Sequence, residues 1–240
     1  MKKITIAANW KKYLNEKESI DFVKKLNKYE DLFYNKYVDI ILFPQAEHLP
    51  AVKDALEIKN VTLGLQDYDY RIKSDSEISS RCHSSGVGLD SCIVGHSERR
   101  MLHKEDNKSI LEKFHTLHAR DIYPILCVGE TQEQRDLGDT LPTIYKQLPE
   151  ETPLFNPLPY AIAYEPVWSI GTGNVPSNKE IELVLSGVIN SKNQPYLFYG
   201  GSVNEDNVEK LLEIDLIDGF LIGGASAKFD SFIQIIKKIN

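Results

Sequence analysis

The sequence predicts an α/β fold, a (β/α)8 barrel that forms a single domain over residues 1–240. Three observations favour it. Short runs rich in β-branched and aromatic residues alternate with segments of helical periodicity along the chain. No Asn-Gly or Asp-Gly hairpin joins consecutive runs, so the connections are crossovers and the sheet is parallel. Eight such units in 240 residues average about 30 residues each, which favours a closed barrel over an open, doubly wound sheet.

The strands are predicted from eight short apolar runs. In chain order these are Ile4–Ala8, Val38–Phe43, Val61–Leu65, Ser91–Val94, Ile122–Val128, Tyr160–Tyr164, Tyr196–Tyr199 and Ile217–Ile222. The segments between them carry apolar residues at spacings of three and four, which is typical of amphipathic helices. Two clear examples are Ile181, Val184, Leu185 and Val188, and Phe232, Ile235, Ile236 and Ile239. Helix starts are indicated by three capping pairs, Asn15 with Glu18, Thr131 with Gln134 and Ser177 with Glu180.

Charge and hydropathy argue against several classes of partner. The chain has 28 basic and 35 acidic residues, a net charge of −7, which disfavours a nucleic acid or an anionic membrane surface. No apolar run approaches the roughly 18 residues of a membrane span. The first apolar run ends too early for a signal peptide, and Cys82, Cys92 and Cys127 lack metal-ligand spacing. We therefore expect reduced thiols and a cytoplasmic location.

Polar residues gather where the predicted strands end. In barrels of this class the chemistry lies at the carboxyl ends of the strands. The residues found there are Asn9-Trp10-Lys11, Gly95-His96-Ser97-Glu98, Gly129-Glu130, Glu165, Gly200-Gly201-Ser202 and Gly223-Gly224. Residues far apart along the chain are thus predicted to meet at one mouth.

Glu165 is the predicted general base. It follows an apolar strand and precedes Pro166-Val167-Trp168 and a Gly-Thr-Gly tip, which together suggest a lid with a rigid hinge. A carboxylate that loses water under a lid becomes more basic and can take a proton from carbon. Most glutamates are surface ion-pair partners instead, but a plain connection needs no rigid hinge beside a flexible tip. The setting therefore favours catalysis.

His96 is the predicted electrophile. It lies just before a predicted helix, whose N–H groups and dipole disfavour an imidazolium, so we expect a neutral ring that hydrogen-bonds a substrate carbonyl. A lone histidine is more often structural, but one that faces Glu165 across a mouth is more often catalytic. The other five histidines form no evident metal-ligand set, so we expect no metal.

A phosphate-binding function is predicted for the remaining mouth residues. Lys11 and Asn9 can stabilise an anionic oxygen, although Lys11 can equally begin a solvated run with Lys12. In barrels the anion site commonly lies in the loops after strands seven and eight. Backbone N–H groups near Gly171, Ser202, Gly223 and Gly224 can serve it there, although glycines also serve ordinary turns.

These motifs resemble those of the triosephosphate isomerase family, in the same order and over essentially the whole chain. The matching segments are Asn9-Trp10-Lys11, Val94–Arg100, Cys127–Thr131, Ala163–Trp168, Ile170–Gly173, Tyr199–Val203 and Leu221–Ser226. The resemblance implies a TIM barrel that interconverts dihydroxyacetone phosphate and glyceraldehyde 3-phosphate without a cofactor, a reaction of glycolysis, gluconeogenesis and the pentose phosphate pathway.

The resemblance also implies a role for each site residue. Glu165 would remove a proton from carbon to give an enediolate, with His96 as a neutral hydrogen-bond donor. Lys11 and Asn9 would stabilise the negative charge. Backbone groups near Gly171, Ser202, Gly223 and Gly224 would hold the phosphate, and a lid over Pro166–Pro176 would close on it. Glu98 and Arg99 are expected to form an ion pair that orients the loop bearing His96.

Three departures from the family pattern stand out. Lys12-Tyr13 replaces a small, partly apolar pair after the first-strand lysine. The third loop, Gln66–Glu77, is shorter than usual and lacks the typical Thr-Gly-Glu sequence, so we expect a homodimer with an altered third-loop interface. Pro176 ends the lid and is expected to change its kinetics.

Three other functions remain open at the level of sequence. A four-carbon ketose phosphate isomerase would use the same base, the same electrophile and the same phosphate-binding residues. A non-catalytic phosphate-binding homologue would retain the fold, although Asn9, Lys11, His96 and Glu165 are all present. A Schiff-base aldolase would use Lys11, but the glutamate on a lid argues against it.

Overall fold

A computed structural model describes residues 2–33, 37–68, 90–149, 159–172, 174–191 and 195–240. Eight parallel strands pair in sequence order and close into a barrel when β1 pairs with β8. The strands are β1 (Ile4–Asn9), β2 (Val38–Phe43), β3 (Val61–Leu65), β4 (Ser91–Val94), β5 (Tyr123–Val128), β6 (Ala161–Tyr164), β7 (Tyr196–Tyr199) and β8 (Gly219–Ile222). The predicted (β/α)8 barrel is confirmed.

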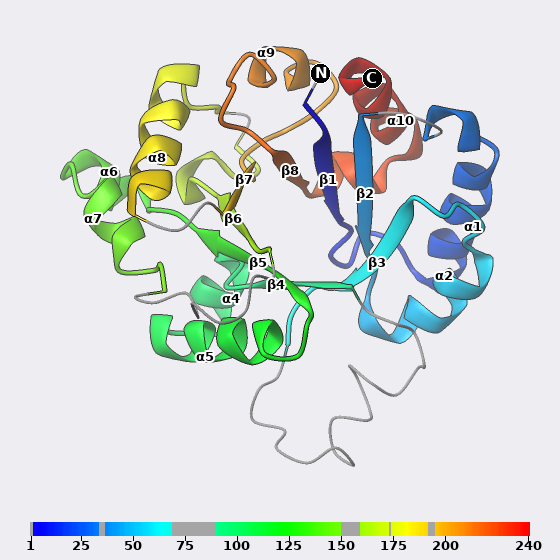
Figure 1. Cartoon of the computed structure of the whole chain (residues 1–240), viewed down its shortest axis with the longest axis horizontal. Coiled ribbons are helices and arrows are strands. Elements are labelled where there is room, and N and C mark those ends of the chain that lie inside the picture. Colours follow the sequence, from blue (N-terminus) through cyan, green and yellow to red (C-terminus); the bar gives the residue numbers. More distant parts are fainter. Residues whose placement is uncertain (1, 34–36, 69–89, 150–158, 173, 192–194) are drawn as a thin grey trace.

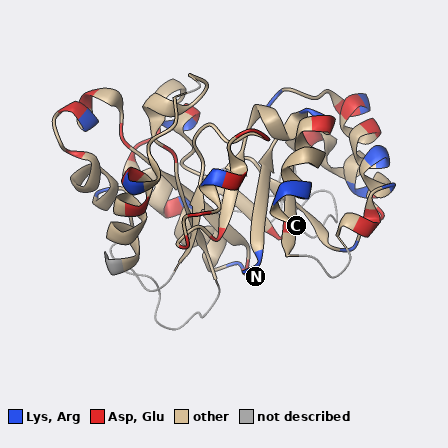
Figure 2. Ribbon diagram, turned by 90° about the horizontal axis from the view of Figure 1, so that it is seen from above, with Lys and Arg blue, Asp and Glu red and all other residues tan. Residues whose placement is uncertain are grey.

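The helices lie around the strands (Figure 1). The α-helices are α1 (Glu16–Asn27), α2 (Leu49–Ala55), α4 (Ser97–Leu102), α5 (Asn107–His118), α6 (Gln132–Asp136), α7 (Thr140–Tyr145), α8 (Asn178–Ser191), α9 (Val208–Leu211) and α10 (Phe229–Ile239). Short 3-10 helices are η1 (Glu30–Leu32), η2 (Ala46–His48), η4 (Val167–Ser169) and η5 (Gly224–Ala227). Basic and acidic residues are mixed along the outer helices (Figure 2).

The three predicted capping pairs are confirmed. Asn15 and Glu18 form a reciprocal capping box at the start of α1, and Thr131 and Gln134 do so at α6. Ahead of α8, the Ser177 backbone N–H donates to Glu180 Oε2 at 2.7 Å. These bonds satisfy backbone N–H groups that have no partner inside a helix, and so set where each helix begins.

Four predicted strands needed correction at one end. β1 extends through Asn9, while β5, β6 and β8 begin one or two residues later than predicted, at Tyr123, Ala161 and Gly219. The cause is clearest at Ile217, whose N–H donates to Ile214 O at 3.0 Å and therefore closes the preceding turn. Such differences lie at element ends, where periodicity carries least information.

Two apolar layers result from the alternation of side chains along each strand. On β2, Ile41 belongs to the cluster inside the barrel, whereas Ile40 and Leu42 pack between the strands and the helices. Glycine makes room for large rings inside the barrel. A Cβ on Gly64 would lie 2.3 Å from Phe43 Cε1, so only glycine fits there. The barrel interior is thus filled by side chains below its mouth.

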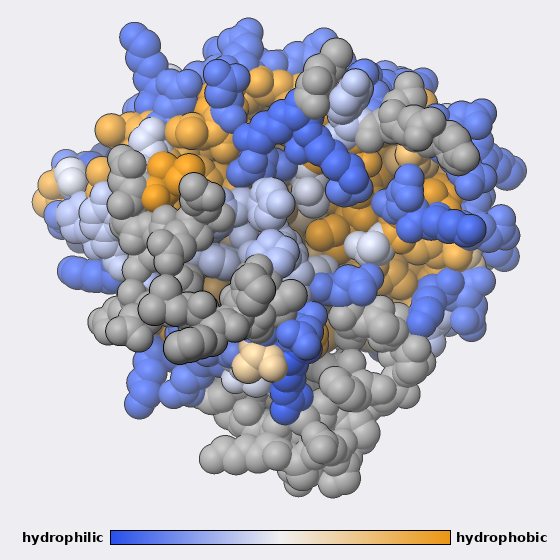
Figure 3. Space-filling view, viewed as in Figure 1, coloured by the Kyte–Doolittle hydropathy of each residue, from blue (hydrophilic) through white to orange (hydrophobic). Residues whose placement is uncertain are grey.

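An aromatic cluster packs the first helix against the last. The Phe22 ring on α1 lies 4.8 Å from that of Trp10, 5.1 Å from that of Phe229 and 5.6 Å from that of Phe232, measured between centroids. Such pairs stabilise a core beyond their buried area. On the face shown in Figure 3, hydrophilic residues surround smaller areas where apolar residues are exposed.

Candidate active site at the carboxyl ends of the strands

A cavity of about 290 Å³ opens at the carboxyl ends of the strands. It brings together every residue predicted for the site, namely Asn9, Lys11, His96, Glu165, Gly171, Ser202, Gly223 and Gly224. They come from the ends of β1, β4, β6, β7 and β8. The structure therefore assembles the constellation that the strand ends predicted, and the individual roles are taken up below.

Glu165 directly follows β6 and is only 3% exposed. Its backbone N–H donates to Val128 O at 2.7 Å, which extends the β5–β6 ladder to Glu165 itself. Glycines on both neighbouring strands make room for it. A Cβ on Gly129 would lie 1.8 Å from Glu165 O, and one on Gly200 would lie 2.8 Å from Glu165 Cγ. These two glycines are thus required by the close approach of Glu165.

The carboxylate of Glu165 faces His96 and the start of α4. Oε2 accepts a hydrogen bond from the Ser97 N–H at 3.2 Å. Oε1 lies 3.4 Å from His96 Nε2. A carboxylate and an imidazole from β6 and β4 therefore face each other inside one cavity. This was the central geometric prediction of the sequence.

His96 is held in one tautomer by its own helix. Its Nδ1 accepts a hydrogen bond from the Glu98 N–H at 3.2 Å, so Nδ1 carries no proton. In a neutral ring the proton is then on Nε2, the atom that faces Glu165. His96 is 7% exposed and is the N-cap residue of α4. A neutral His96 can therefore donate a hydrogen bond into the cavity.

Lys11 is fixed in an uncommon backbone conformation. Its φ of 46° lies in the left-handed region, which costs a non-glycine residue about 1 kcal/mol or more. Its N–H donates to Asn9 Oδ1 at 3.1 Å, and its carbonyl accepts from Gln66 Nε2 at 2.9 Å. These bonds hold Lys11 at the end of β1, with its ammonium directed into the site.

Glu98 pairs with Lys11 rather than with Arg99. Lys11 Nζ lies 2.6 Å from Glu98 Oε1. Partial burial by itself raises the pKa of Glu98, but the hydrogen bond and charge of Lys11 outweigh it, so this pKa lies below its ordinary value. The expected Glu98–Arg99 ion pair is therefore wrong, and Glu98 instead pairs with Lys11 at the cavity.

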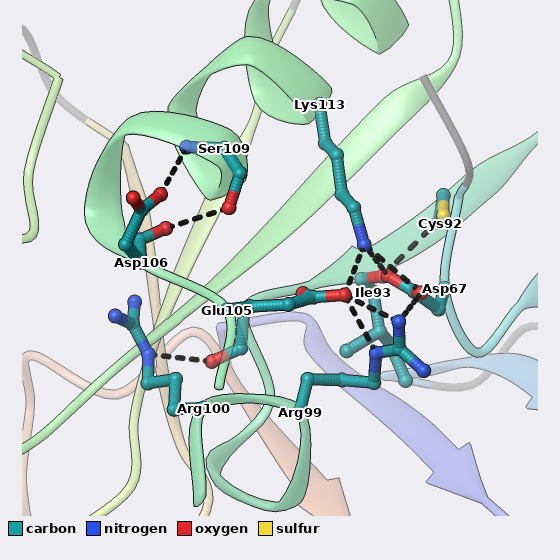
Figure 4. Close-up of polar contacts among 10 residues, drawn as sticks. Asp67, Cys92, Ile93, Arg99, Arg100, Glu105, Asp106, Ser109 and Lys113 are labelled. Carbon is teal, nitrogen blue, oxygen red and sulfur yellow. Dashed lines mark hydrogen bonds and ion pairs between the residues drawn. The ribbon is translucent and has the colours of Figure 1, made fainter. Parts of the chain in front are cut away.

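Arg99 belongs to a separate cluster behind the site (Figure 4). It contacts Glu105 and lies 3.0 Å from Asp67 Oδ2, while Lys113 Nζ lies 2.7 Å from Asp67 and 2.8 Å from Glu105. Burial raises the pKa of Asp67 despite its two cationic neighbours. The cluster joins the end of β3 to α4 and α5. It thereby fixes the helix that carries Ser97 and Glu98, and no local pattern in the sequence predicts it.

The predicted lid is anchored at its leading end. Trp168 Nε1 donates to Glu130 Oε1 at 2.8 Å, and the Tyr164 hydroxyl donates to the same oxygen at 3.2 Å. The Arg135 guanidinium lies 4.2 Å from the centre of the Trp168 ring, a cation–π contact. Glu130 is fully buried. The hinge after Glu165 is therefore held by residues from β5, β6 and α6.

The lid contacts the loop after β7 through its 3-10 helix η4. Gly171 has a φ of 71°, a conformation that glycine adopts readily. The Ser202 hydroxyl donates to Ser169 O at 2.8 Å, and so links the seventh loop to the lid. Gly173 lies outside the described residues.

The last loop is tied to the first. Trp10 Nε1 donates to Ser226 O at 3.1 Å, although the two residues are 216 positions apart. The Ser226 hydroxyl donates to Gly223 O at 2.7 Å, which fixes the glycine pair before η5. Gly223 and Gly224 are thus held at a constant position relative to β1.

The cysteines show no sign of nucleophilic chemistry. Burial, together with the nearby Glu165 carboxylate, raises the pKa of Cys127 well above its ordinary value, so it is a neutral thiol. Cys92 is also buried, and Cys82 lies outside the described residues. Within the described ranges there is no cluster of three or more His, Cys, Asp or Glu that could hold a metal ion, and no helix there is long and apolar enough to cross a membrane.

Comparison with known proteins agrees with this geometry. The family model described as triosephosphate isomerase matches residues 4–239. The triosephosphate isomerases of Picosynechococcus sp. and Buchnera aphidicola are each 34% identical to this chain, over the full length of both partners. That of Psychrobacter cryohalolentis is 36% identical over 82% of this chain and 80% of its own. The chain therefore belongs to the triosephosphate isomerase family.

Proposed function

We propose that this chain interconverts dihydroxyacetone phosphate and D-glyceraldehyde 3-phosphate, an aldose–ketose isomerisation of glycolysis. Membership of the family supports the reaction. The observation that carries it is the pair formed by the Glu165 carboxylate and His96 Nε2, 3.4 Å apart in the cavity. We further propose a cytoplasmic location, where the same reaction serves gluconeogenesis and the pentose phosphate pathway.

Glu165 is the proposed general base. It takes a proton from one substrate carbon to give an enediolate and returns it to the neighbouring carbon, while the hydroxyl proton passes from one substrate oxygen to the other beside His96. Proton transfer between a carboxylate and carbon needs neither a redox group nor a metal, so the proposed reaction uses no cofactor. In the structure the Glu165 carboxylate accepts a hydrogen bond from the Ser97 N–H. It must give up this bond to reach the substrate carbon. Its place at the hinge of the lid allows closure to make that exchange.

His96 and Lys11 are proposed to stabilise the enediolate. A neutral His96 donates from Nε2 to the substrate oxygens, because its Nδ1 is occupied by the Glu98 N–H. The Lys11 ammonium neutralises the developing negative charge, and Asn9 holds the Lys11 backbone. Lys11 Nζ lies 2.6 Å from Glu98 Oε1, and a Schiff base formed on Lys11 would break this ion pair, which argues against the aldolase alternative.

The phosphate group is proposed to bind at the other side of the cavity. Gly171, Ser202, Gly223 and Gly224 line this side and come from the lid and the last two loops. Their backbone N–H groups are the proposed donors to the phosphate oxygens. Closure of Pro166–Pro176 would bring Gly171 closer to the phosphate and exclude water, which protects the enediolate from losing phosphate.

Two further competing functions are less well supported. Membership of the triosephosphate isomerase family favours a three-carbon substrate over a four-carbon ketose phosphate. A non-catalytic homologue would have no use for a base and an imidazole held this close. Comparing the catalytic efficiency on three-carbon and four-carbon ketose phosphates distinguishes the proposed function from the four-carbon isomerase. Phosphate binding without turnover would indicate the non-catalytic homologue.

Substitution of Glu165 by aspartate tests the proposed reaction. Glu165→Asp withdraws the carboxylate by roughly 1 Å, and we expect kcat to fall about 100-fold or more, because misplacement on this scale disrupts proton transfer. A coupled isomerase assay measures kcat, and circular dichroism checks the fold. Equal turnover by both proteins would contradict the assignment of Glu165 as the base.

A further inference from the structure

Tyr13 lines the same cavity as the predicted site residues, although no role has been assigned to it. It is one of the departures from the family pattern noted in the sequence. Its side chain is 57% exposed, which places its ring at the rim of the cavity rather than in the core. Within the part of the chain that the structure describes, its hydroxyl makes no hydrogen bond to the protein.

The ring of Tyr13 lies over Gly224. A Cβ built on Gly224 would lie 3.7 Å from both Cζ and the hydroxyl oxygen of Tyr13. Beside it, a Cβ built on Gly223 would lie 3.6 Å from Cε and 3.9 Å from Nζ of Lys11. A cation and a hydroxyl from one loop thus lie above two consecutive glycines of another. An anion bound at that glycine pair is within reach of both.

The position of Tyr13 is fixed by the backbone on either side. The Tyr13 N–H donates to Trp10 O at 2.9 Å, and this tight turn contains Lys11 in its left-handed conformation. Trp10 in turn donates to Ser226 O at 3.1 Å. Because Trp10 ties the first loop to the last, the backbone of Tyr13 is held close to Gly224. The fold therefore places the ring within reach of the glycine pair.

We propose that the Tyr13 hydroxyl is an additional donor to the phosphate group of the substrate. This inference rests on the proposed function and adds a side-chain contact to a group otherwise held by backbone N–H groups and Lys11. A phosphate dianion accepts several hydrogen bonds, and those to a charged acceptor are stronger than neutral ones. Tyr13 is a substrate-binding residue in this scheme and takes no part in proton transfer.

Tyr13→Phe removes only the hydroxyl and leaves the ring, so it tests the contact without disturbing the loop. The probe is inorganic phosphate, titrated by calorimetry into the whole protein. We expect the dissociation constant to rise about five-fold, the ratio typical of losing one hydrogen bond. The KM for dihydroxyacetone phosphate should rise by a similar factor with kcat unchanged, because the contact is equal in the ground and transition states.

Tyr196→Phe is the matched control. Tyr196 is 49% exposed and lies at the start of β7, at the opposite end of the barrel. Its substitution should leave phosphate binding and KM at the wild-type values. Equal phosphate affinity of Tyr13→Phe and wild type, or no phosphate binding by the wild type, would overturn the role of Tyr13. Weaker phosphate binding by Tyr13→Phe in a protein without isomerase activity would support that role and reject the proposed function instead.

Discussion

The carboxylate of Glu105 makes the stability of the folded protein depend on pH. It contacts Arg99, and its Oε1 lies 2.8 Å from Lys113 Nζ. Burial by itself raises the pKa of Glu105, but hydrogen bonds from both cations outweigh it and lower this pKa below the ordinary 4.5. A lowered native pKa means that ionised Glu105 stabilises the fold. That stability is fully present above pH 4.5 and is lost as the pH falls through the native value.

Glu105→Gln should therefore destabilise the protein in a pH-dependent way. We expect the free energy of unfolding to fall by about 2 kcal/mol at pH 7, because a charged hydrogen-bond acceptor is lost. The Lys113 side chain is only 4% exposed and would keep Asp67 alone as its carboxylate partner. Urea denaturation followed by circular dichroism measures the difference. It should shrink as the pH falls below 4.5.

Glu112→Gln provides the comparison, because Glu112 lies on the same helix, α5, outside the cluster. Its unfolding free energy should follow that of the wild type. If Glu105→Gln lowered the free energy of unfolding by the same amount at every pH, the charge on Glu105 would not be the cause of the loss.

Local sequence predicted which residues lie at the site better than it predicted their partners. All eight predicted residues line one cavity, because a strand end can be recognised from a few neighbouring residues. Glu98 was assigned to the adjacent Arg99, yet it pairs with Lys11, 87 positions away. Consecutive residues on a helix do not face each other. The correct partner depends on how β1 and α4 meet in space, which no local pattern records.

At the scale of elements, burial predicted where apolar residues lie but not where the strands begin. Ile122 is 9% exposed and Ile217 only 1%, so both are buried, as residues of a strand would be. Their N–H groups nevertheless donate to Leu117 O and Ile214 O, which closes the turns before β5 and β8. Most carboxyl ends were placed correctly, because polar or glycine residues follow there. The carboxyl ends of the strands, which form the mouth of the barrel, were thus more predictable than the amino ends.

The trailing hinge of the lid supplies a prediction at the same scale. Pro176 is buried and restricts the backbone where the lid rejoins the barrel. Pro176→Ala should give the open lid more conformations, so that closure loses more entropy. We expect kcat/KM to fall about two- to five-fold. Steady-state kinetics on dihydroxyacetone phosphate measures this, and an unchanged turnover and KM would reject the role of the proline.

At the scale of the whole molecule, exposed apolar residues support the proposed homodimer. Tyr13 is 57% exposed, and Met101 and Leu102 on α4 are 45% and 71% exposed. The Lys11–Glu98 contact joins the first loop to α4, the helix that carries Met101 and Leu102. The altered third loop, of which residues 69–77 lie outside the described residues, is expected to contribute to the same interface.

Leu102→Glu should disrupt that dimer. A buried, unpaired carboxylate at the interface is costly, so we expect a monomer at micromolar concentration. Light scattering coupled to size-exclusion chromatography gives the mass. Leu183→Glu, on α8 and 64% exposed in the wild type, should leave the mass unchanged. A monomeric wild type would refute the dimer.

The bond from Trp10 to Ser226 has a consequence for synthesis on the ribosome. It joins residues 216 positions apart, and β1 completes the barrel only by pairing with β8. Contacts between such distant segments form late, because a long loop must close first. A nascent chain that still lacks β8 can already carry His96 and Glu165, yet it has no complete site for an anion. Competence to turn over substrate is therefore acquired only after β8 and the residues that follow it, Gly223 to Ser226, have left the ribosome.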